Sequence, residues 1–427
     1  MMYTHDIRNA FEETIGNTGA GKKEFTADVE VARKAITVLR KHQQDNTLPI
    51  LNVGERKDDL VLIEKAAQRI SNSCDTLVVL GMGGSGRGGN TLVSLVKNTF
   101  TGIAGKTKIH FVENIDPHTF DQLLSSITLK NTIFLAISKS GSTAETLAQV
   151  LVLIKEVETK VGKDSIADHF VFITEPHDNA MRRLGTEYNI PMLEHDPNIG
   201  GRFAALTAVG LLPAKVAGLD IHAIRYSASE VVKHTLADAD SEPAKGAALH
   251  NTMLKKGRTV SVLMPYCDRL DALGAWHQQL WEESLGKDRL GTVLLRALGA
   301  TDQHSQLQLY LDGPHDKFIT LILLEQKKAG KLIPAAKDKS LAYLNNHTIG
   351  GLMEAEQRAT AETLTLNKCP LRVFNLKTLD EKSVGALMMH FMLETMITAH
   401  LWNINAFDQP AVEQGKKLAR EYLLNAA

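Results

Sequence analysis

The chain has 427 residues, a net charge of −1 at pH 7, 44% hydrophobic residues and 23% charged residues. This is the composition of an ordinary soluble globular protein of two or three domains, and it gives no reason to expect a nucleic-acid or membrane partner. Cys74, Cys267 and Cys369 lie far apart and form no CxxC pair. They argue against a disulfide framework or a zinc site and favour a reducing, cytoplasmic compartment.

Two segments bear on targeting and on the membrane. The N-terminal residues, Met1 to Phe25, are polar and mixed in charge, so we expect no secretory leader. The longest apolar stretch, Val384 to Trp402, is interrupted by His390, Glu394 and His400. Because a membrane span rarely carries such side chains, we expect a buried helix there.

The first half of the chain alternates strand-like and helix-like segments after a helical, peripheral segment. β-Branched, apolar runs predict strands at 76–80, 109–112, 133–137 and 170–174. A glycine-rich loop, Gly81 to Gly89, follows the first strand, and a helical run extends from Asn90 to Lys97. Continuous apolar strands separated by helices predict a doubly wound parallel sheet with helices on both faces.

The second half repeats this alternation after Leu212 to Leu219, which is interpreted as a turn between domains. Further strands are expected at 259–264, 307–311 and 318–324, and a helix at 276–285. Two C-terminal helices are expected around a break at Asn403 to Pro410. The predicted organisation is a helical segment (1–55), two tandem α/β domains (56–215 and 216–380) and C-terminal helices (381–427).

A hydroxyl-rich turn, Ser138 to Thr143, lies between a predicted strand and a predicted helix at 145–157. Unpaired backbone N–H groups and the helix dipole favour an anion at such a helix start, and hydroxyl groups add donors. Ser138, Ser140 and Thr143, with the Lys139 backbone, are therefore candidates to bind a terminal phosphate. The alternative is a serine-rich loop in which one hydroxyl caps the helix.

The loop from Gly81 to Gly86 matches the G-x-G-x-x-G pattern of dinucleotide-binding folds, with Glu113 as a possible ribose ligand. A dinucleotide site needs no second hydroxyl-rich turn one strand further on, whereas a sugar phosphate uses one loop for the phosphate and one for the sugar. We therefore favour a sugar phosphate, with Gly83, Gly84 and Ser85 beside it.

A candidate general base follows in the second half. Gln279 and Glu283 are four residues apart on one helix face, near Trp276 and Trp281. A carboxylate in apolar surroundings can act as a base near neutral pH. The alternative is a solvent-exposed ion pair between Glu283 and Lys287.

Two further side chains suit proton transfer and charge stabilisation. His304 lies in a turn-like loop and could move a proton near pH 7, although a single histidine is more often structural. Arg202 follows two glycines and could stabilise a developing oxyanion, the alternative being an ordinary loop salt bridge.

The last helix is predicted to start near Gln409 and to place Gln409 and Lys416 two turns apart on one face. The adjoining apolar face is formed by Val412, Gly415, Ala419 and Tyr422. Lys416 should then lie at the edge of a buried face and either extend to solvent or reach into a cleft.

Together these motifs resemble the glucose-6-phosphate isomerase family, from Leu80 to the C-terminus. The matching segments are Ser138–Thr146, Gly200–Phe203, Gln279 with Glu283–Lys287, Gln303–His304 and Asn403–Lys416. The glycine-rich loop is shared by sugar isomerase (SIS) domains. The sequence departs from the larger members at Ser140-Gly141-Ser142 (usually Thr-Phe-Thr), Leu285 (usually Asn) and Pro410-Ala411 (usually Trp-Gly), and its length resembles the compact bacterial branch.

The resemblance implies two SIS-type doubly wound domains and an aldose–ketose isomerisation of glucose 6-phosphate and fructose 6-phosphate through a cis-enediol. It implies that Glu283 moves the proton between C2 and C1 and that Arg202 stabilises the enediolate. His304 and Lys416 would assist ring opening, and Gln279 and Gln409 would contact the substrate. No metal or organic cofactor is implied. A homodimer is implied, in which the histidine enters the neighbouring subunit's site.

Three alternatives stay open from the sequence. A bifunctional glucose/mannose-phosphate isomerase would keep all these residues. A non-catalytic SIS regulator would keep the Ser138 loop without needing Glu283, Arg202, His304 and Lys416 together. An NAD-dependent dehydrogenase would use the glycine-rich loop alone.

Overall fold

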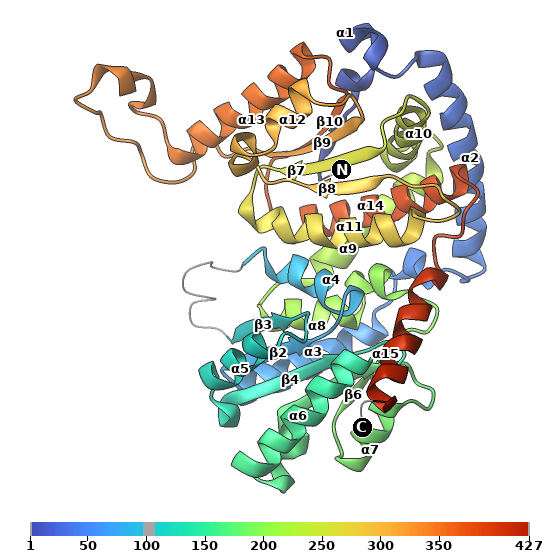
Figure 1. Cartoon of the computed structure of the whole chain (residues 1–427), viewed down its shortest axis with the longest axis vertical. Coiled ribbons are helices and arrows are strands. Elements are labelled where there is room, and N and C mark those ends of the chain that lie inside the picture. The colour runs from blue at the N-terminus through green and yellow to red at the C-terminus, as the bar shows by residue number, and fades with distance from the viewer. Residues whose placement is uncertain (1, 97–106, 426–427) are drawn as a thin grey trace.

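The computed structural model describes residues 2–96 and 107–425 and contains two five-stranded sheets, stacked along the long axis of the molecule and flanked by helices (Figure 1). The first sheet is parallel throughout, in the order β3-β2-β4-β5-β6. Its strands are β2 (Thr76–Leu80), β3 (Lys108–Val112), β4 (Thr132–Ile137), β5 (Phe170–Thr174) and β6 (Met192–Glu194). Its helices are α3 (Asp58–Ser73), α4 (Gly84–Val93), α5 (Pro117–Ser126), α6 (Ala144–Lys160), α7 (Ala180–Glu187) and α8 (Ala208–Val216).

The second sheet has the order β1-β10-β9-β7-β8, with only β1 antiparallel to its neighbour among the described strands. Its strands are β1 (Thr4–Asp6), β7 (Val260–Pro265), β8 (Val293–Arg296), β9 (Lys317–Leu324) and β10 (Leu371–Leu376). The helices of this half are α1 (Glu12–Ile15), α2 (Lys22–Gln44), α9 (Ile221–Ala237), α10 (Glu242–Lys255), α11 (Asp271–Leu285), α12 (Leu307–Asp312), α13 (Ile349–Leu366) and α14 (Glu381–Leu401). The C-terminal helix α15 (Glu413–Asn425) lies at the level of the first sheet (Figure 1). Both sheets confirm the predicted doubly wound α/β class.

The four predicted strands of the first sheet are confirmed to within one residue. Strands β2, β4 and β5 are continuous apolar runs buried on both faces, whereas β3 lies at the sheet edge and is only partly buried. The predicted helix start at Asn90 is wrong, since α4 already begins at Gly84. Its glycines permit close packing: a Cβ on Gly88 would lie 2.6 Å from Ala205 Cβ. Glycine therefore serves here as a helix-contact residue and not only as a loop former.

Three other predictions are wrong. Residues 1–55 are not only helical and peripheral, because β1 joins the second sheet beside β10. Residues 307–311 form helix α12, whose apolar side chains recur at helical spacing and pack around buried Tyr310. The predicted turn at 212–219 is wrong in its extent, since most of these residues lie in buried helix α8; the turn is confined to Ala217 and Gly218, with φ +86° at Gly218, and joins α8 to α9.

Helix α14 forms the core of the second half and packs against α9, α10, α11 and α2. It is the one described helix that is long and apolar enough to cross a membrane, but 89% of its apolar window is buried inside the protein. The prediction of a buried helix at Val384 to Trp402 is therefore confirmed. A break follows α14, and the chain then forms the short 3-10 helix η10 (Pro410–Val412) and α15, so that the last helix begins at Glu413 and not near Gln409.

Candidate functional site

The site lies where two loops leave the carboxyl edge of the first sheet. Strands β2 and β4 are parallel neighbours, with Leu80 opposite Ala136. The loops that follow them, Gly81–Gly83 and Ser138–Thr143, therefore emerge side by side. The chain passes from β2 outward to β3 and then returns to β4 on the other side of β2, and open α/β sheets bind ligands at such a reversal.

The Ser138 loop presents a set of hydroxyl groups at the start of α6. Ser138 is buried, and its Oγ lies 2.9 Å from Thr143 Oγ1. Ser140 Oγ accepts a hydrogen bond from Ser142 Oγ at 2.9 Å. Gly141 has φ +60°, and a Cβ there would lie 1.8 Å from Asn179 Oδ1. Only glycine fits this turn, which explains the departure from the bulkier residue of the larger family members.

The first turn of α6 is suited to an anion. Thr143 is its N-cap residue but makes no side-chain cap bond, because its hydroxyl pairs with Ser138. The amides of this turn are therefore left for a ligand. Thr146 Oγ1 is buried in the same turn and has no hydrogen-bond partner in the described structure. The sequence motif contained Thr146, yet only the burial of its hydroxyl identifies it as a candidate ligand residue.

The glycine-rich loop contacts the second half of the molecule. Gly83 has φ +52°, and a Cβ on it would lie 2.7 Å from Gln279 Nε2. A Cβ on Gly84 would lie 2.6 Å from the Arg202 backbone nitrogen. Ser85, partly exposed in the first turn of α4, donates its backbone N–H to Met82 O at 3.1 Å. The two glycines thus bring the glycine-rich loop against α11 and against the 3-10 helix that carries Arg202.

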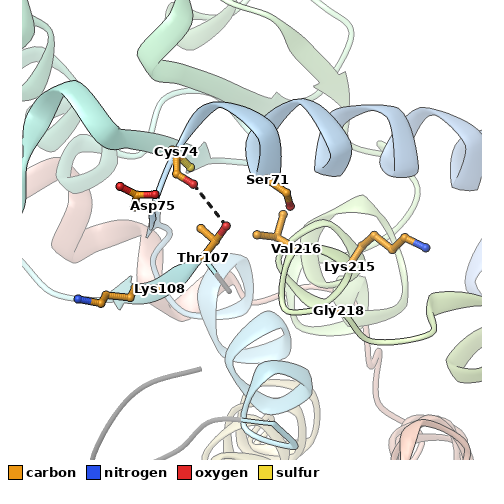
Figure 2. A pocket seen from close by; sticks show the side chains of 8 residues that line it. All are labelled: Ser71, Cys74, Asp75, Thr107, Lys108, Lys215, Val216 and Gly218. Carbon is orange, nitrogen blue, oxygen red and sulfur yellow. Dashed lines mark hydrogen bonds between the residues drawn. The ribbon is translucent and has the colours of Figure 1, made fainter. Parts of the chain in front are cut away.

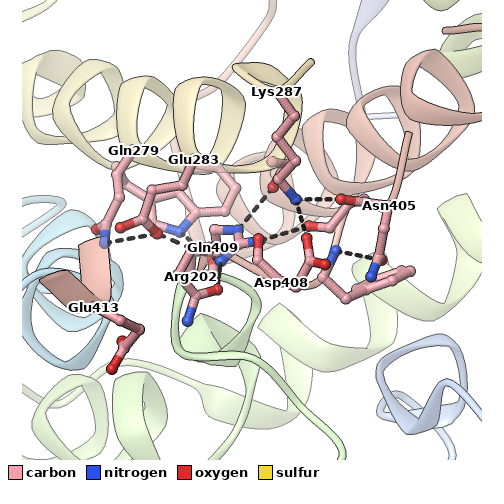
Figure 3. A network of polar contacts seen from close by, with 12 residues as sticks. Arg202, Gln279, Glu283, Lys287, Asn405, Asp408, Gln409 and Glu413 are labelled. Carbon is pink, nitrogen blue, oxygen red and sulfur yellow. Dashed lines mark hydrogen bonds and ion pairs between the residues drawn. The ribbon is translucent and has the colours of Figure 1, made fainter. Parts of the chain in front are cut away.

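Arg202 is buried in the 3-10 helix η6 (Gly201–Leu206), and other segments of the chain hold its guanidinium group (Figure 3). Its Nε donates to Ser284 Oγ at 2.8 Å, and one terminal nitrogen donates to Gln409 Oε1 at 2.8 Å. The other terminal nitrogen donates to Ala406 O at 2.6 Å and to Asp408 O at 3.1 Å. Burial lowers the pKa of Arg202, while Glu283 and Asp408 oppose that shift. Arg202 also forms an ion pair with Glu283 at 3.5 Å, but an ordinary loop salt bridge does not account for the site, because most of the acceptors are neutral.

Glu283 lies beside Arg202 near the end of α11. Its Oε2 is 3.5 Å from the Arg202 guanidinium and 3.4 Å from Gln279 Nε2. The side chain is 35% exposed and is therefore accessible to a ligand. Lys287 does not pair with Glu283; its Nζ lies 2.6 Å from Asp408 Oδ1. The ion pair between Glu283 and Lys287, which is the alternative role for Glu283, is therefore absent from the described part of the chain.

Two predicted catalytic residues lie outside this cluster within one chain. His304 is exposed at the end of the 3-10 helix η8 (Thr301–His304), and no bond among the described residues joins it to Arg202 or Glu283. Lys416 is 65% exposed and pairs with Glu413 at 2.7 Å. The prediction that α15 buries an apolar face is wrong for the single chain, since all its described residues are exposed.

A separate cavity of about 590 Å³ lies at the opposite, amino edge of the first sheet, near the starts of β2 and β3 (Figure 2). Thr107, Lys108 and Cys74 are among its lining residues, and the Thr107 hydroxyl donates to the Cys74 carbonyl at 3.5 Å. None of the predicted site residues lines it. Its place, away from the strand ends where such folds bind ligands, sets it apart from the candidate site.

Comparison with known proteins agrees with this geometry. The family model described as Phosphoglucose isomerase matches residues 65–426. A glucose-6-phosphate isomerase of Rubrobacter xylanophilus is 35% identical over 423 residues, 97% of this chain and 96% of that protein. One of Thermus thermophilus is 35% identical over 356 residues, 82% of this chain and 84% of that protein.

Solved structures share the fold. A hypothetical protein from Thermus thermophilus aligns with a TM-score of 0.88 and 32% identity, covering 99% of this chain and all of that one. A glucose-6-phosphate isomerase from Chlamydia trachomatis aligns with a TM-score of 0.74 and 22% identity, covering 94% of this chain and 86% of that one. The family model and the near full-length relatives together show that the chain belongs to the phosphoglucose isomerase family.

Proposed function

We propose that this protein interconverts D-glucose 6-phosphate and D-fructose 6-phosphate through a cis-enediol intermediate. The observation that carries the proposal is the pairing of a carboxylate and a buried guanidinium, Glu283 and Arg202, next to a hydroxyl-rich anion loop. A non-catalytic sugar-phosphate sensor would need the loop but not this pair. An NAD-dependent dehydrogenase would need neither, and its relatives would not be the isomerases found here.

The phosphate of the substrate would bind at the Ser138 loop. The hydroxyls of Ser138, Ser140 and Thr143, the Lys139 backbone and the buried Thr146 hydroxyl would donate to its oxygens. Hydrogen bonds to a charged acceptor are stronger than those between neutral groups. This anchor lies far from the reacting carbons, so its role is to place C1 and C2 beside α11.

Glu283 would then act as the general base on the open-chain sugar. It removes the C2 proton of the aldose, the C2–H electron pair forms the C1–C2 double bond, and the carbonyl electrons move to O1. Arg202 stabilises this enediolate. After a proton has moved from O2 to O1, Glu283 returns its proton to C1, which leaves a ketone at C2. A positioned base and a preorganised cation supply most of the rate enhancement.

Gln279 and Gln409 hold the two reactive groups in place, since each makes a hydrogen bond to Glu283 or to Arg202. His304 and Lys416 would assist opening and closing of the sugar ring. Because both are exposed and outside the cluster in one chain, we propose that a second copy completes the site. The segment between β9 and α13, which projects from the body (Figure 1), exposes Leu332 and Tyr343 and supports a homodimer. The free cysteines support a cytoplasmic location.

Solvent exchange with Glu283→Gln tests this function. In D2O the wild-type enzyme, dialysed against EDTA, should interconvert the two sugar phosphates and place deuterium at C2 of glucose 6-phosphate. The Gln variant keeps the shape but cannot accept the proton, and removal of a general base should lower kcat by about 10²–10⁴.

Glu282→Gln is the matched control, one residue away on the same helix. Glu282 accepts a hydrogen bond from the Leu294 backbone, which a glutamine oxygen can also do. Exchange at the wild-type rate in Glu283→Gln would refute the assignment of the base. A parallel assay on mannose 6-phosphate would decide whether the enzyme is bifunctional.

A further inference from the structure

A second cation holds the segment that orients Arg202. Residues 403–409 connect α14 to the C-terminal 3-10 helix and α15. Lys287, two residues after the end of α11, donates from Nζ to Asp408 Oδ1 at 2.6 Å and also to the Asn405 carbonyl (Figure 3). The Lys287 side chain is only 12% exposed. Both bonds join positions more than 100 residues apart in sequence, so Lys287 fixes the segment to α11.

The same segment supplies most of the groups that hold the guanidinium of Arg202. The carbonyls of Ala406 and Asp408 accept from one nitrogen, and the Gln409 side chain accepts from another. A shift of this segment would therefore turn the guanidinium. Since the stabilisation of an oxyanion depends on the direction of the donors, such a turn acts on the transition state.

Lys287 also determines where the Asp408 carboxylate lies. Asp408 is 54% exposed on its side chain, and its negative charge lies close enough to Arg202 to affect the guanidinium. With Lys287 present, the carboxylate is bound to the ammonium group. Without it, Asn405 is the one described side chain that still holds the carboxylate by a hydrogen bond, and Asp408 can turn toward Arg202 and offset the positive charge that the enediolate requires.

We propose that Lys287 is a positioning residue for the isomerisation: it fixes the 403–409 segment and holds the Asp408 carboxylate away, so that Arg202 stays aimed at the enediolate. This inference rests on the proposed function. It differs from a surface ion pair, which usually contributes little, because Lys287 is largely buried and binds a backbone carbonyl as well as a carboxylate.

Lys287→Met tests the inference, with Lys256→Met as its matched control. Lys256 likewise donates to a carboxylate and to a carbonyl, Glu12 Oε1 at 2.6 Å and Asn17 O at 3.3 Å, but lies outside the site. We expect Lys287→Met to lower kcat by about 10- to 100-fold, as misplacement of catalytic groups does, with KM changed less than about twofold. Lys256→Met should keep the wild-type kcat.

Two further variants separate positioning from other roles. Lys287→Arg, which keeps the charge and the donors, should retain most of kcat. Adding Asp408→Asn to Lys287→Met should restore part of kcat, since the competing charge is gone. Wild-type kcat in Lys287→Met would overturn the proposal, and so would a rise in KM alone, which would make Lys287 a substrate contact. Failure of the double variant to recover would also overturn the charge argument.

Amide hydrogen exchange provides a measurement that does not depend on activity. Peptides covering 403–409 should exchange faster in Lys287→Met than in the wild type, while Lys256→Met should leave them unchanged. Equal exchange in all three proteins would refute the fixing of the segment. If the wild-type protein did not isomerise sugar phosphates, the proposed function would fail, but this comparison would still decide the structural part of the inference.

Discussion

Acid should destabilise the second half of this protein steeply, because histidines are buried in its core in neutral form. His250 Nε2 lies 3.1 Å from an Arg372 guanidinium nitrogen, and Arg372 forms a buried ion pair with Glu394 at 2.7 Å. His390 contacts Glu394 at 2.9 Å, and His5 contacts Glu242 at 3.1 Å.

His277 belongs to the same core and stacks on Phe391 with ring centroids 4.2 Å apart. Its two ring nitrogens have no partner in the described part of the chain. With His5, His250 and His390 it forms what we call the buried histidine cluster.

The direction and size of the acid effect follow from the pKa values. Burial lowers the pKa of His5 and of His250 to about 4 and that of His277 to about 3, from 6.5. The unfolded chain therefore binds protons first, so stability is complete above pH 6.5 and is lost as the pH falls toward 4. At pH 5 each of the three histidines His5, His250 and His277 should lower the free energy of unfolding by about 2 kcal/mol, about 6 kcal/mol together. The total stability of a folded protein is roughly 5–15 kcal/mol.

Tryptophan fluorescence during urea unfolding at pH 7.5, 6 and 5 measures this loss. All three tryptophans lie in the same half of the protein, and the Trp281 ring is 4.4 Å from the His250 ring. His277→Phe should unfold at the same or a higher urea concentration at pH 7.5 and should lose about 2 kcal/mol less by pH 5. His118→Asn, at an exposed histidine, should show the full loss. A urea midpoint that stays constant from pH 7.5 to pH 5 would refute the reasoning.

Two further predictions concern the Ser138 loop. Thr143→Ala removes one hydroxyl from the phosphate, which should cost about 1.5–3 kcal/mol of substrate binding and raise KM more than it lowers kcat; steady-state kinetics with an unchanged KM would contradict the phosphate assignment. Gly141→Ala places a Cβ against Asn179 at φ +60° and should destabilise the loop by at least about 1–2 kcal/mol. Thermal unfolding and KM should both change, and a variant with wild-type values for both would show that the turn is not constrained as the structure indicates.

The sequence alone predicts those parts of the fold that depend on local patterns. The apolar runs at Thr76–Leu80 and Phe170–Thr174 are strands because both faces are covered by helices, and their composition reflects this. The strand prediction at 307–311 is wrong because a run of only five residues, four apolar and one polar, fits both the two-residue period of a strand and the 3.6-residue period of a helix. Strand β1 has no strong local signal, since its pairing depends on β10, more than 360 residues later.

The candidate site was predicted as a set of residues but not as an arrangement. Gln279 and Glu283 follow from helical spacing, and the structure places them together. The partner of Lys287 cannot be predicted from helical spacing. Spacing favours Glu283, four residues earlier, but Lys287 pairs with Asp408, which lies 121 residues further on. Ser284, which accepts a bond from Arg202, carries no signal beyond its place beside Glu283.

The surroundings of Arg202 suit the proposed chemistry because they satisfy its donors without neutralising its charge. Ser284 Oγ, Gln409 Oε1 and the carbonyls of Ala406 and Asp408 are all uncharged acceptors. Among these partners only Glu283, at 3.5 Å, is a carboxylate, and in the proposed mechanism it would lose its charge on taking the substrate proton. The attraction between Glu283 and Arg202 would therefore weaken at the moment when the enediolate forms, and the guanidinium would become available to the new anion. On the proposed mechanism, the contact that stabilises the resting site would thus favour the transition state once the proton has moved.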